Sequence, residues 1–213
     1  MKELLSLNQE ILGETCGIFA GNGSMYTAGE SHVLEVRGNK EELEYYKNRV
    51  KWLFDRILSR ETKIIKRSYQ GGYLIGIRSC DQEAIQTFHV MLEFPIGKRD
   101  DNFKIPKVIV NNHEYWPHYI RGIFDTNGSV YLRRTGRKYQ NPVIDISSSS
   151  IEHLKQLKEI LKDIGFNFWL EESNSKIRMA GYKNTQRFFK VIKPHNNTKI
   201  KKQEEIMLRW LSG

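Results

Sequence analysis

The sequence contains little cysteine and no long apolar run. Two cysteines, Cys16 and Cys80, cannot build a disulfide framework, and no CxxC pair is present to hold zinc. No apolar segment reaches the roughly 18 to 20 residues that a membrane helix needs, and the opening MKELLSLNQE has no signal-peptide pattern. We therefore expect a cytoplasmic protein with no membrane partner.

Basic residues outnumber acidic residues in this sequence. The 213 residues carry 34 Lys and Arg against 25 Asp and Glu, a net charge of +9. Between residues 175 and 213 the ratio reaches ten to two. The length of 213 residues allows one large or two small domains, and a content of 39% hydrophobic residues allows a core to form. A content of 28% charged residues excludes a disordered tail. The charge favours a polyanionic partner such as nucleic acid, although ribosomal and membrane-surface proteins share this bias.

The chain contains an internal repeat. The segment 16–24, CGIFAGNGS, returns at 121–129 as RGIFDTNGS, with six of nine positions identical at a separation of 105 residues. Further along, 33–36 (VLEV) is echoed by 143–146 (VIDI). Apolar residues at helical spacing follow in both halves. The sequence therefore predicts two copies of one structural unit.

Each copy is expected to have the element order αββαββα, which gives an α+β fold. Asn39 and Ser150 are the predicted N-caps of the central helices. The predicted repeats are 1–98 and 113–213, joined by a linker at 99–112, with a basic amphipathic helix at 197–211. The predicted helices are 9–21, 40–58 and 82–92 in the first copy, and 115–126, 151–164 and 185–192 in the second. The predicted hairpins are 24–37, 62–78, 129–147 and 167–180.

Small residues recur four apart in the repeated segment. Gly17 and Gly21 share one helix face, and Gly122 and Thr126 share the corresponding face of the second copy. Small residues at this spacing let two helices approach backbone to backbone. We expect the two helices to pack side by side about a pseudo-two-fold axis, with their C-terminal ends emerging together.

These residues and their duplication resemble the LAGLIDADG homing endonucleases in their single-chain, two-motif form. The resemblance covers nearly the whole chain. It implies that the motif helices form the interface and that the two four-stranded sheets form a saddle on double-stranded DNA. It further implies Mg²⁺ held by an acid at the eighth motif position, hydrolysis of both DNA strands, an intron or intein origin, and a monomer that needs no protein partner.

The sequence departs from this family at the position that holds the metal. The eighth residues are Asn22 and Asn127 instead of Asp or Glu. Magnesium is normally held by carboxylates, whereas asparagine offers one neutral oxygen. Metal binding through Asn22, Asn127 and nearby backbone carbonyls is therefore expected to be weak or lost, and cleavage impaired or absent. DNA binding is expected to survive.

The candidate DNA-contacting residues lie on the predicted hairpins. Arginine can read guanine, glutamine adenine, and glutamate can accept from cytosine. The candidates are Glu35, Arg37, Lys66, Arg67, Gln70, Tyr73, Arg78, Arg133, Arg134, Arg137, Lys138, Lys176 and Arg178. Because strand side chains alternate, Arg133 and Arg134 cannot both face the groove. Lys98 and Lys199 resemble the family's basic residues near the cleavage centre.

Three other functions remain open at this stage. The chain could be an active divalent-metal endonuclease that tolerates asparagine, or an RNA-binding intron maturase, since some family members act in splicing. It could also be a basic α+β protein that uses its hairpins for protein contacts. Plasmid nicking, RNA competition and binding at low salt separate these alternatives from site-specific DNA binding without cleavage.

Overall fold

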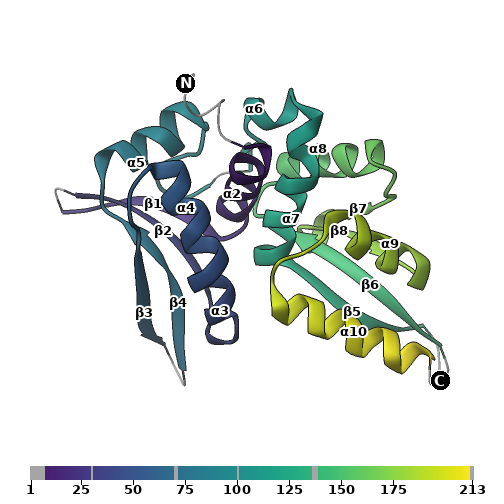
Figure 1. Ribbon diagram of the computed structural model, residues 1–213. Helices are drawn as coiled ribbons and strands as arrows, with labels where there is room; N and C mark the ends of the chain where they lie inside the picture. The colour runs from purple at the N-terminus through teal and green to yellow at the C-terminus, as the bar shows by residue number, and fades with distance from the viewer. Residues whose placement is uncertain (1–7, 30, 70–71, 100, 136–138, 212–213) are drawn as a thin grey trace.

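The fold consists of two similar α+β halves. The computed structural model describes residues 8–29, 31–69, 72–99, 101–135 and 139–211 (Figure 1). The elements of the first half are α2 (Gln9–Asn22), β1 (Gly23–Ala28), β2 (Ser31–Asn39), η1 (Lys40–Glu42), α3 (Leu43–Tyr45), η2 (Tyr46–Val50), α4 (Lys51–Leu58), β3 (Lys63–Tyr69), β4 (Gly72–Ser79), α5 (Gln82–Gln86) and η3 (Thr87–Met91).

The second half repeats this order. Its elements, with the short helices that precede it, are α6 (Lys107–Val110), η4 (His113–Tyr115), α7 (Trp116–Asn127), β5 (Gly128–Thr135), β6 (Tyr139–Ser147), α8 (Ile151–Asp163), β7 (Trp169–Glu171), η5 (Glu172–Asn174), β8 (Lys176–Ala180), α9 (Tyr182–Ile192) and α10 (Asn197–Leu211). The predicted αββαββα order is confirmed in both halves. The terminal helix has the predicted bounds.

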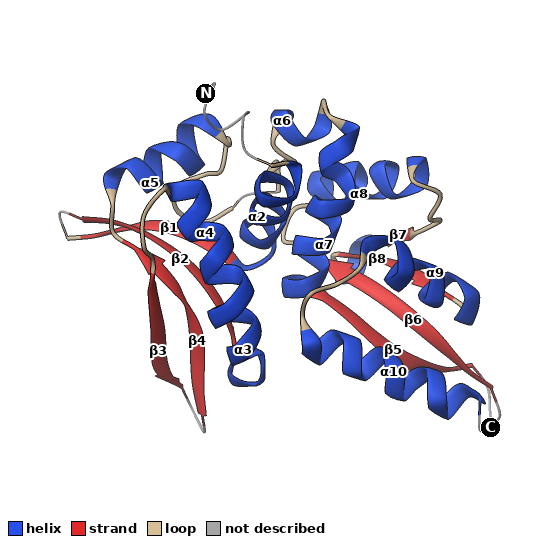
Figure 2. Cartoon of the chain, in the orientation of Figure 1, coloured by secondary structure: helices blue, strands red, loops and turns tan. Residues whose placement is uncertain are grey.

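Each half contains one antiparallel four-stranded sheet. The strand orders are β1-β2-β4-β3 and β5-β6-β8-β7, so the two sheets have the same topology. Helices pack on one face of each sheet over an aromatic core. In this core Phe19 lies 4.5 Å from Phe88, and the corresponding Phe124 lies 5.0 Å from Phe188, measured between ring centroids. The two sheets diverge from the ends of α2 and α7 (Figure 2).

The helices α2 and α7 pack against each other in the same direction at the centre of the molecule (Figure 1). A Cβ atom at Gly17 would lie 2.1 Å from the carbonyl oxygen of Tyr119, and one at Gly122 would lie 2.3 Å from that of Glu14. At the C-terminal ends, a Cβ at Gly21 would lie 2.1 Å from Oγ1 of Thr126. The small residues therefore allow direct backbone contact between the halves.

The central helix of the first half is less regular than predicted. Residues 40–58 form four consecutive helical segments instead of one, and the Lys51 N–H bonds to the Tyr46 carbonyl in a wide turn. The ring of Tyr46 packs against Gly38, and its hydroxyl donates to the Arg37 carbonyl at 2.6 Å. In the second half Ser150 accepts from the His153 N–H as the predicted N-cap.

The predicted linker contains a helix that the sequence did not indicate, α6.

The terminal helix α10 lies along the edge strand β5 (Figure 1). Its Trp210 stacks on Tyr182 with 4.3 Å between ring centroids. Covering this edge protects it from pairing with another chain. Among the described residues, no helix has both the length and the apolar character required to cross a membrane.

Candidate nucleic-acid interface

Asn22 and Asn127 are the last residues of α2 and α7, and both use their side-chain amide groups as donors. Asn22 Nδ2 donates to the carbonyl oxygen of Thr126 at 3.3 Å, which links the two helices. Asn127 Nδ2 donates to the carbonyl oxygen of Ser147 at 2.9 Å, and Ser147 Oγ donates back to the Asn127 carbonyl at 3.3 Å. Both side chains are half-buried.

This arrangement does not fit a divalent metal. An amide nitrogen cannot ligate a hard cation, and each asparagine has only one neutral oxygen remaining. The nearby acids do not supply the missing charge: Asp145 accepts from Ser129 Oγ and faces Lys176. Oδ2 of the buried Asp125 accepts from the His195 N–H at 2.8 Å, and burial raises the pKa of Asp125 to about 8. Within the part of the chain that the structure describes, the two helix ends therefore carry neutral amides where carboxylates would be needed to hold and charge-balance such an ion.

Each helix end instead carries a basic side chain. Lys199 Nζ donates to the Gly128 carbonyl at 2.5 Å, at the end of α7. Arg99 donates to the carbonyls of Phe19, Ala20 and Gly23 at the end of α2. Burial lowers the pKa of Lys199 and lowers that of Arg99 to about 10, so Arg99 is cationic at neutral pH. A cation at a helix C-terminus is favoured by the helix dipole.

The structure thus places Lys199, but not Lys98, at a motif helix. Lys98 is exposed, and its neighbour Arg99 turns inward between the rings of Phe19 and Phe103. The sequence analysis missed Arg99 because both basic residues lie in a segment without regular structure, where no periodicity distinguishes inward from outward positions. The only available signal was the position of a basic pair after the last helix of the repeat.

The open face of the first sheet carries a carboxylate surrounded by arginines. Strand alternation and register place Glu35 on β2 opposite Arg78 on β4, with Arg37 and Arg67 on the same face. Glu35 Oε2 accepts from Arg37 Nε at 2.8 Å, and Oε1 accepts from Arg67 NH2 at 2.8 Å. Arg78 Nε lies 3.5 Å from Oε1. Glu35 itself is fully buried, so it presents no free acceptor to a base.

Two predicted contacts lie on the opposite side of this sheet. Lys66 and Tyr73 alternate with Arg67 and Leu74, which places them on the helix-packed face together with Ile75. Lys66 Nζ lies 5.4 Å from the Tyr73 ring centroid. These two candidates therefore do not share the open face with Arg67 and Arg78, since neighbouring strand residues alternate between the two faces. Gln70 lies outside the described residues.

The open face of the second sheet has a related arrangement around Asp145. This residue lies opposite Ser129 on β5 and Arg178 on β8. Its Oδ2 lies 3.3 Å from Lys176 Nζ and 3.7 Å from Arg178 Nε, and Arg178 also pairs with Glu171.

The hairpin formed by β5 and β6 supplies one exposed cation to this face among its described side chains. Arg133 shares the alternation of Ser129 and is exposed. Arg134 pairs with Gln140 in the strand register, and its side chain lies outside the described part of the structure. Arg137 and Lys138 also lie outside the described residues.

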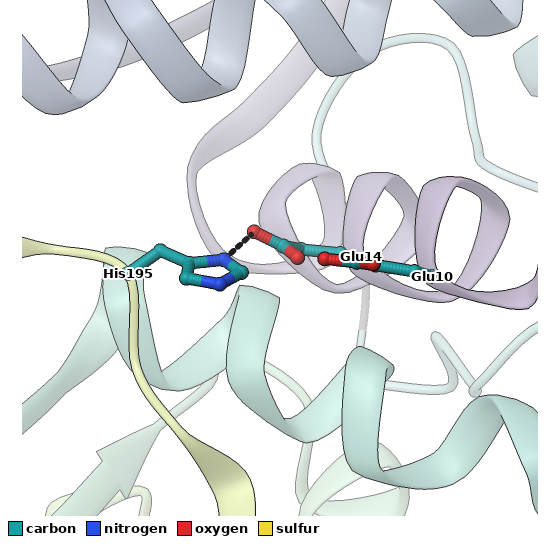
Figure 3. Close-up of side chains that lie close together, drawn as sticks. All are labelled: Glu10, Glu14 and His195. Atoms are coloured by element: carbon teal, nitrogen blue, oxygen red, sulfur yellow. Dashed lines mark hydrogen bonds and ion pairs between the residues drawn. The ribbon is translucent and has the colours of Figure 1, made fainter.

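A separate ionic cluster connects the two halves beside α2. Figure 3 shows the His195 ring directed at Glu14, with Glu10 one helical turn away; His195 Nδ1 lies 3.0 Å from Glu14 Oε1. The three groups are close enough to suggest a metal site, with ligand atoms within 4.8 Å of one another. However, Arg49 and Arg121 both pair with the two glutamates, so the acidic charge is already balanced.

Both halves match families of known domains. Residues 118–193 match the family described as LAGLIDADG-like domain, and residues 14–94 match the family described as WhiA LAGLIDADG-like domain. No curated protein matches the chain in sequence. The chain therefore contains two LAGLIDADG-like domains in tandem.

Solved structures of homing endonucleases share this fold. Mesophilic variants of I-DmoI match with a TM-score of 0.57 and 14% identity over 88% of this chain and 91% of that one. A variant of I-SmaMI matches with a TM-score of 0.60 and 11% identity, over 95% of this chain and 91% of that one. I-WcaI bound to its DNA recognition sequence matches with a TM-score of 0.56 and 13% identity, over 91% of this chain and 86% of that one. This chain has the fold of the single-chain LAGLIDADG homing endonucleases.

Proposed function

We propose that the protein recognises a specific double-stranded DNA site as a monomer and does not cut it. The observation that carries this proposal is the pair of asparagines at the helix ends. Their amides donate to the carbonyls of Thr126 and Ser147, where a homing endonuclease of this type would need carboxylates for Mg²⁺. The protein keeps the interface and both sheets but lacks the charge for metal-dependent hydrolysis.

Relatives of the same fold support the choice of DNA as the partner. I-WcaI has been solved on its DNA recognition sequence, and I-DmoI in complex with DNA and Mn. In this chain the open faces carry Arg37, Arg67 and Arg78 in one half and Arg133, Lys176 and Arg178 in the other. Repeats 1–98 and 113–213, joined by 99–112, would each cover about one helical turn.

Binding and cleavage are tested separately. Fluorescent random-sequence duplexes are selected for binding in EDTA, and the affinity of the selected duplex is measured against salt. We expect binding without metal and a log-log slope of about −0.9 for each phosphate contact. A slope near zero, or equal affinity for all duplexes, would contradict specific DNA recognition.

The same selected duplex, placed in a plasmid, is incubated with Mg²⁺ or Mn²⁺. We expect the plasmid to remain supercoiled. Specific nicking or linearisation would identify an active endonuclease that tolerates asparagine. Intron RNA serves as the competitor: if it displaces duplex DNA at lower concentration than unlabelled duplex does, an RNA-binding role replaces this proposal.

A further inference from the structure

Glu35 is a charged side chain with no exposed surface on the open face of its sheet. The arginines around it remain partly exposed, with 40% of the side chain of Arg37, 43% of Arg67 and 32% of Arg78 accessible. They come from three different strands, β2, β3 and β4. A buried carboxylate needs partners to offset the loss of water, and these three guanidinium groups supply them.

The geometry leaves part of each guanidinium group available. Arg37 directs Nε and NH2 at Glu35, so its NH1 group is not engaged in that pair. Arg67 contacts Glu35 through NH2. The hydrogen bonds that Arg37 donates to Glu35 raise the pKa of Arg37. Since a guanidinium has five N–H donors, each arginine can be held from below by Glu35 and still present donors outward.

The second half has a residue at the matching position. In the repeated segments VLEV and VIDI, Glu35 corresponds to Asp145, which is 3% exposed and also faces basic side chains across the strands. The two groups differ in charge. Glu35 faces three arginines, whereas Asp145 and Glu171 together face Lys176 and Arg178. The first cluster has a net positive charge, and the second is neutral.

We propose that Glu35 is a positioning residue that holds Arg37, Arg67 and Arg78 in one arrangement suited to a particular DNA sequence, with Asp145 in the same role in the second half. This inference rests on the proposed function. A negative charge on a DNA-facing surface weakens general attraction to phosphates. Its benefit is order: arginines already fixed before binding lose less side-chain entropy on contact, and only one arrangement of donors is offered.

These two effects of Glu35 have opposite signs, which makes the inference testable. Glu35→Gln removes the repulsive charge and releases the arginines. We expect its affinity for an unselected duplex to rise a few-fold and its affinity for the selected duplex to fall roughly tenfold or more. The control is Glu159→Gln on α8, an exposed side chain with the same change in charge. It should preserve the ratio of the two affinities.

A second variant separates geometry from charge and protects against a folding defect. Glu35→Asp keeps the charge but shortens the side chain by one methylene. Thermal unfolding verifies that each variant folds. We expect Glu35→Asp to bind the unselected duplex as the parent does and to bind the selected duplex more weakly. If both Glu35 variants keep the parent's ratio of affinities, Glu35 acts through its charge alone and the inference is overturned.

A measurement without DNA distinguishes failure of the positioning role of Glu35 from failure of the proposed DNA-binding function. In ¹⁵N spectra of the free protein, the Arg37 Nε proton should exchange slowly with water, and Glu35→Gln should accelerate that exchange at least tenfold. Unchanged exchange would overturn the positioning role. If the parent enriches no duplex from the random pool yet shows this protected proton, the DNA proposal fails while the positioning of the arginines stands.

Discussion

The side-chain amides of Asn22 and Asn127 do more than remove two charges. The Asn22 amide donates to the Thr126 carbonyl in the last turn of α7, where carbonyl oxygens lack helical partners, and the Asn127 amide donates to the Ser147 carbonyl at the end of β6. An aspartate at either position could not donate this bond, and its charge would oppose the helix dipole. The asparagines therefore suit a protein that has no metal at these helix ends.

Replacing Asn127 by aspartate should destabilise the protein more than the same change at Asn22. Asn127→Asp breaks a 2.9 Å bond and sets a carboxylate oxygen against the Ser147 carbonyl, at a cost of about 1 to 3 kcal/mol. Asn22→Asp breaks a 3.3 Å bond and should cost about 1 kcal/mol. Urea unfolding in EDTA measures both. Asn174→Asp, an exposed site, is the control; equal stability of all three variants would show that the amides do not act as donors.

Asp125, inside the second motif, gives a pH-dependent prediction. Burial raises its pKa from 3.8 to about 8, so the folded protein retains a proton that the unfolded chain releases. This group's contribution to stability is therefore present below about pH 4 and declines as the pH rises through 8. Asp125→Asn should remove that decline and stabilise the protein at pH 9. Melting temperatures of parent and variant from pH 5 to 9 test this. If the two curves run parallel, Asp125 does not titrate with a raised pKa in the folded protein.

At the scale of secondary-structure elements, the closeness of α2 and α7 depends on glycine. In Gly17→Ala the new methyl group would meet the Tyr119 carbonyl oxygen at 2.1 Å and the Ile123 nitrogen at 2.9 Å, both backbone atoms. The helices would have to separate, at a cost of about 1 to 3 kcal/mol or more. Gly72→Ala meets no atom within 4 Å and should be nearly neutral. Chemical denaturation compares the two; similar losses would mean that the interface adjusts freely.

The end of α2 depends on Arg99. Arg99→Met keeps much of the side-chain packing against Phe103 but leaves the carbonyls of Phe19, Ala20 and Gly23 without this donor. Losing charged hydrogen bonds at a buried site should cost about 2 kcal/mol or more. Lys98→Met is the matched neighbour, and its exposed side chain should make little difference. A thermal shift for Lys98→Met as large as for Arg99→Met would argue against this cap.

The elements themselves could largely be predicted from sequence, because periodicity and duplication are local signals. The repeated nonapeptide, the spacing of Gly17 and Gly21, and the apolar stripe of 151–164 correspond to observed helices and contacts. Contacts that join distant segments were not predictable in this way. Glu14 meets Arg49 and His195, which are 35 and 181 residues away in the chain. No period links such residues, so only the fold shows that they are partners.

At the scale of the whole molecule, the ionic cluster ties the halves together. Burial alone would raise the pKa of Glu14, but hydrogen bonds from Arg49 and His195 lower it to about 2. Its stabilising effect is therefore present above pH 4.5 and lost as the pH falls towards 2. Glu14→Gln should cost about 3 kcal/mol at pH 7, since Glu10 alone would then balance Arg49 and Arg121 in this cluster.

The pH profile of Glu14→Gln tests this coupling. Its stability should fall less than that of the parent between pH 5 and pH 2, because the group that gains a proton is missing. Glu44→Gln, at an exposed pair with Lys47, is the control and should follow the parent. If Glu14→Gln and the parent lose the same stability in acid, the cluster does not link the two halves through this carboxylate.

The unequal carboxylate clusters around Glu35 and Asp145 have a consequence for how the protein would sit on DNA. Two identical subunits can be rotated end for end without any change, whereas this chain has a distinguishable left and right side. A duplex bound in one orientation would meet three arginines first, and in the reverse orientation a neutral cluster. The preferred site need not be a palindrome, and the bound protein would have one defined orientation along the duplex.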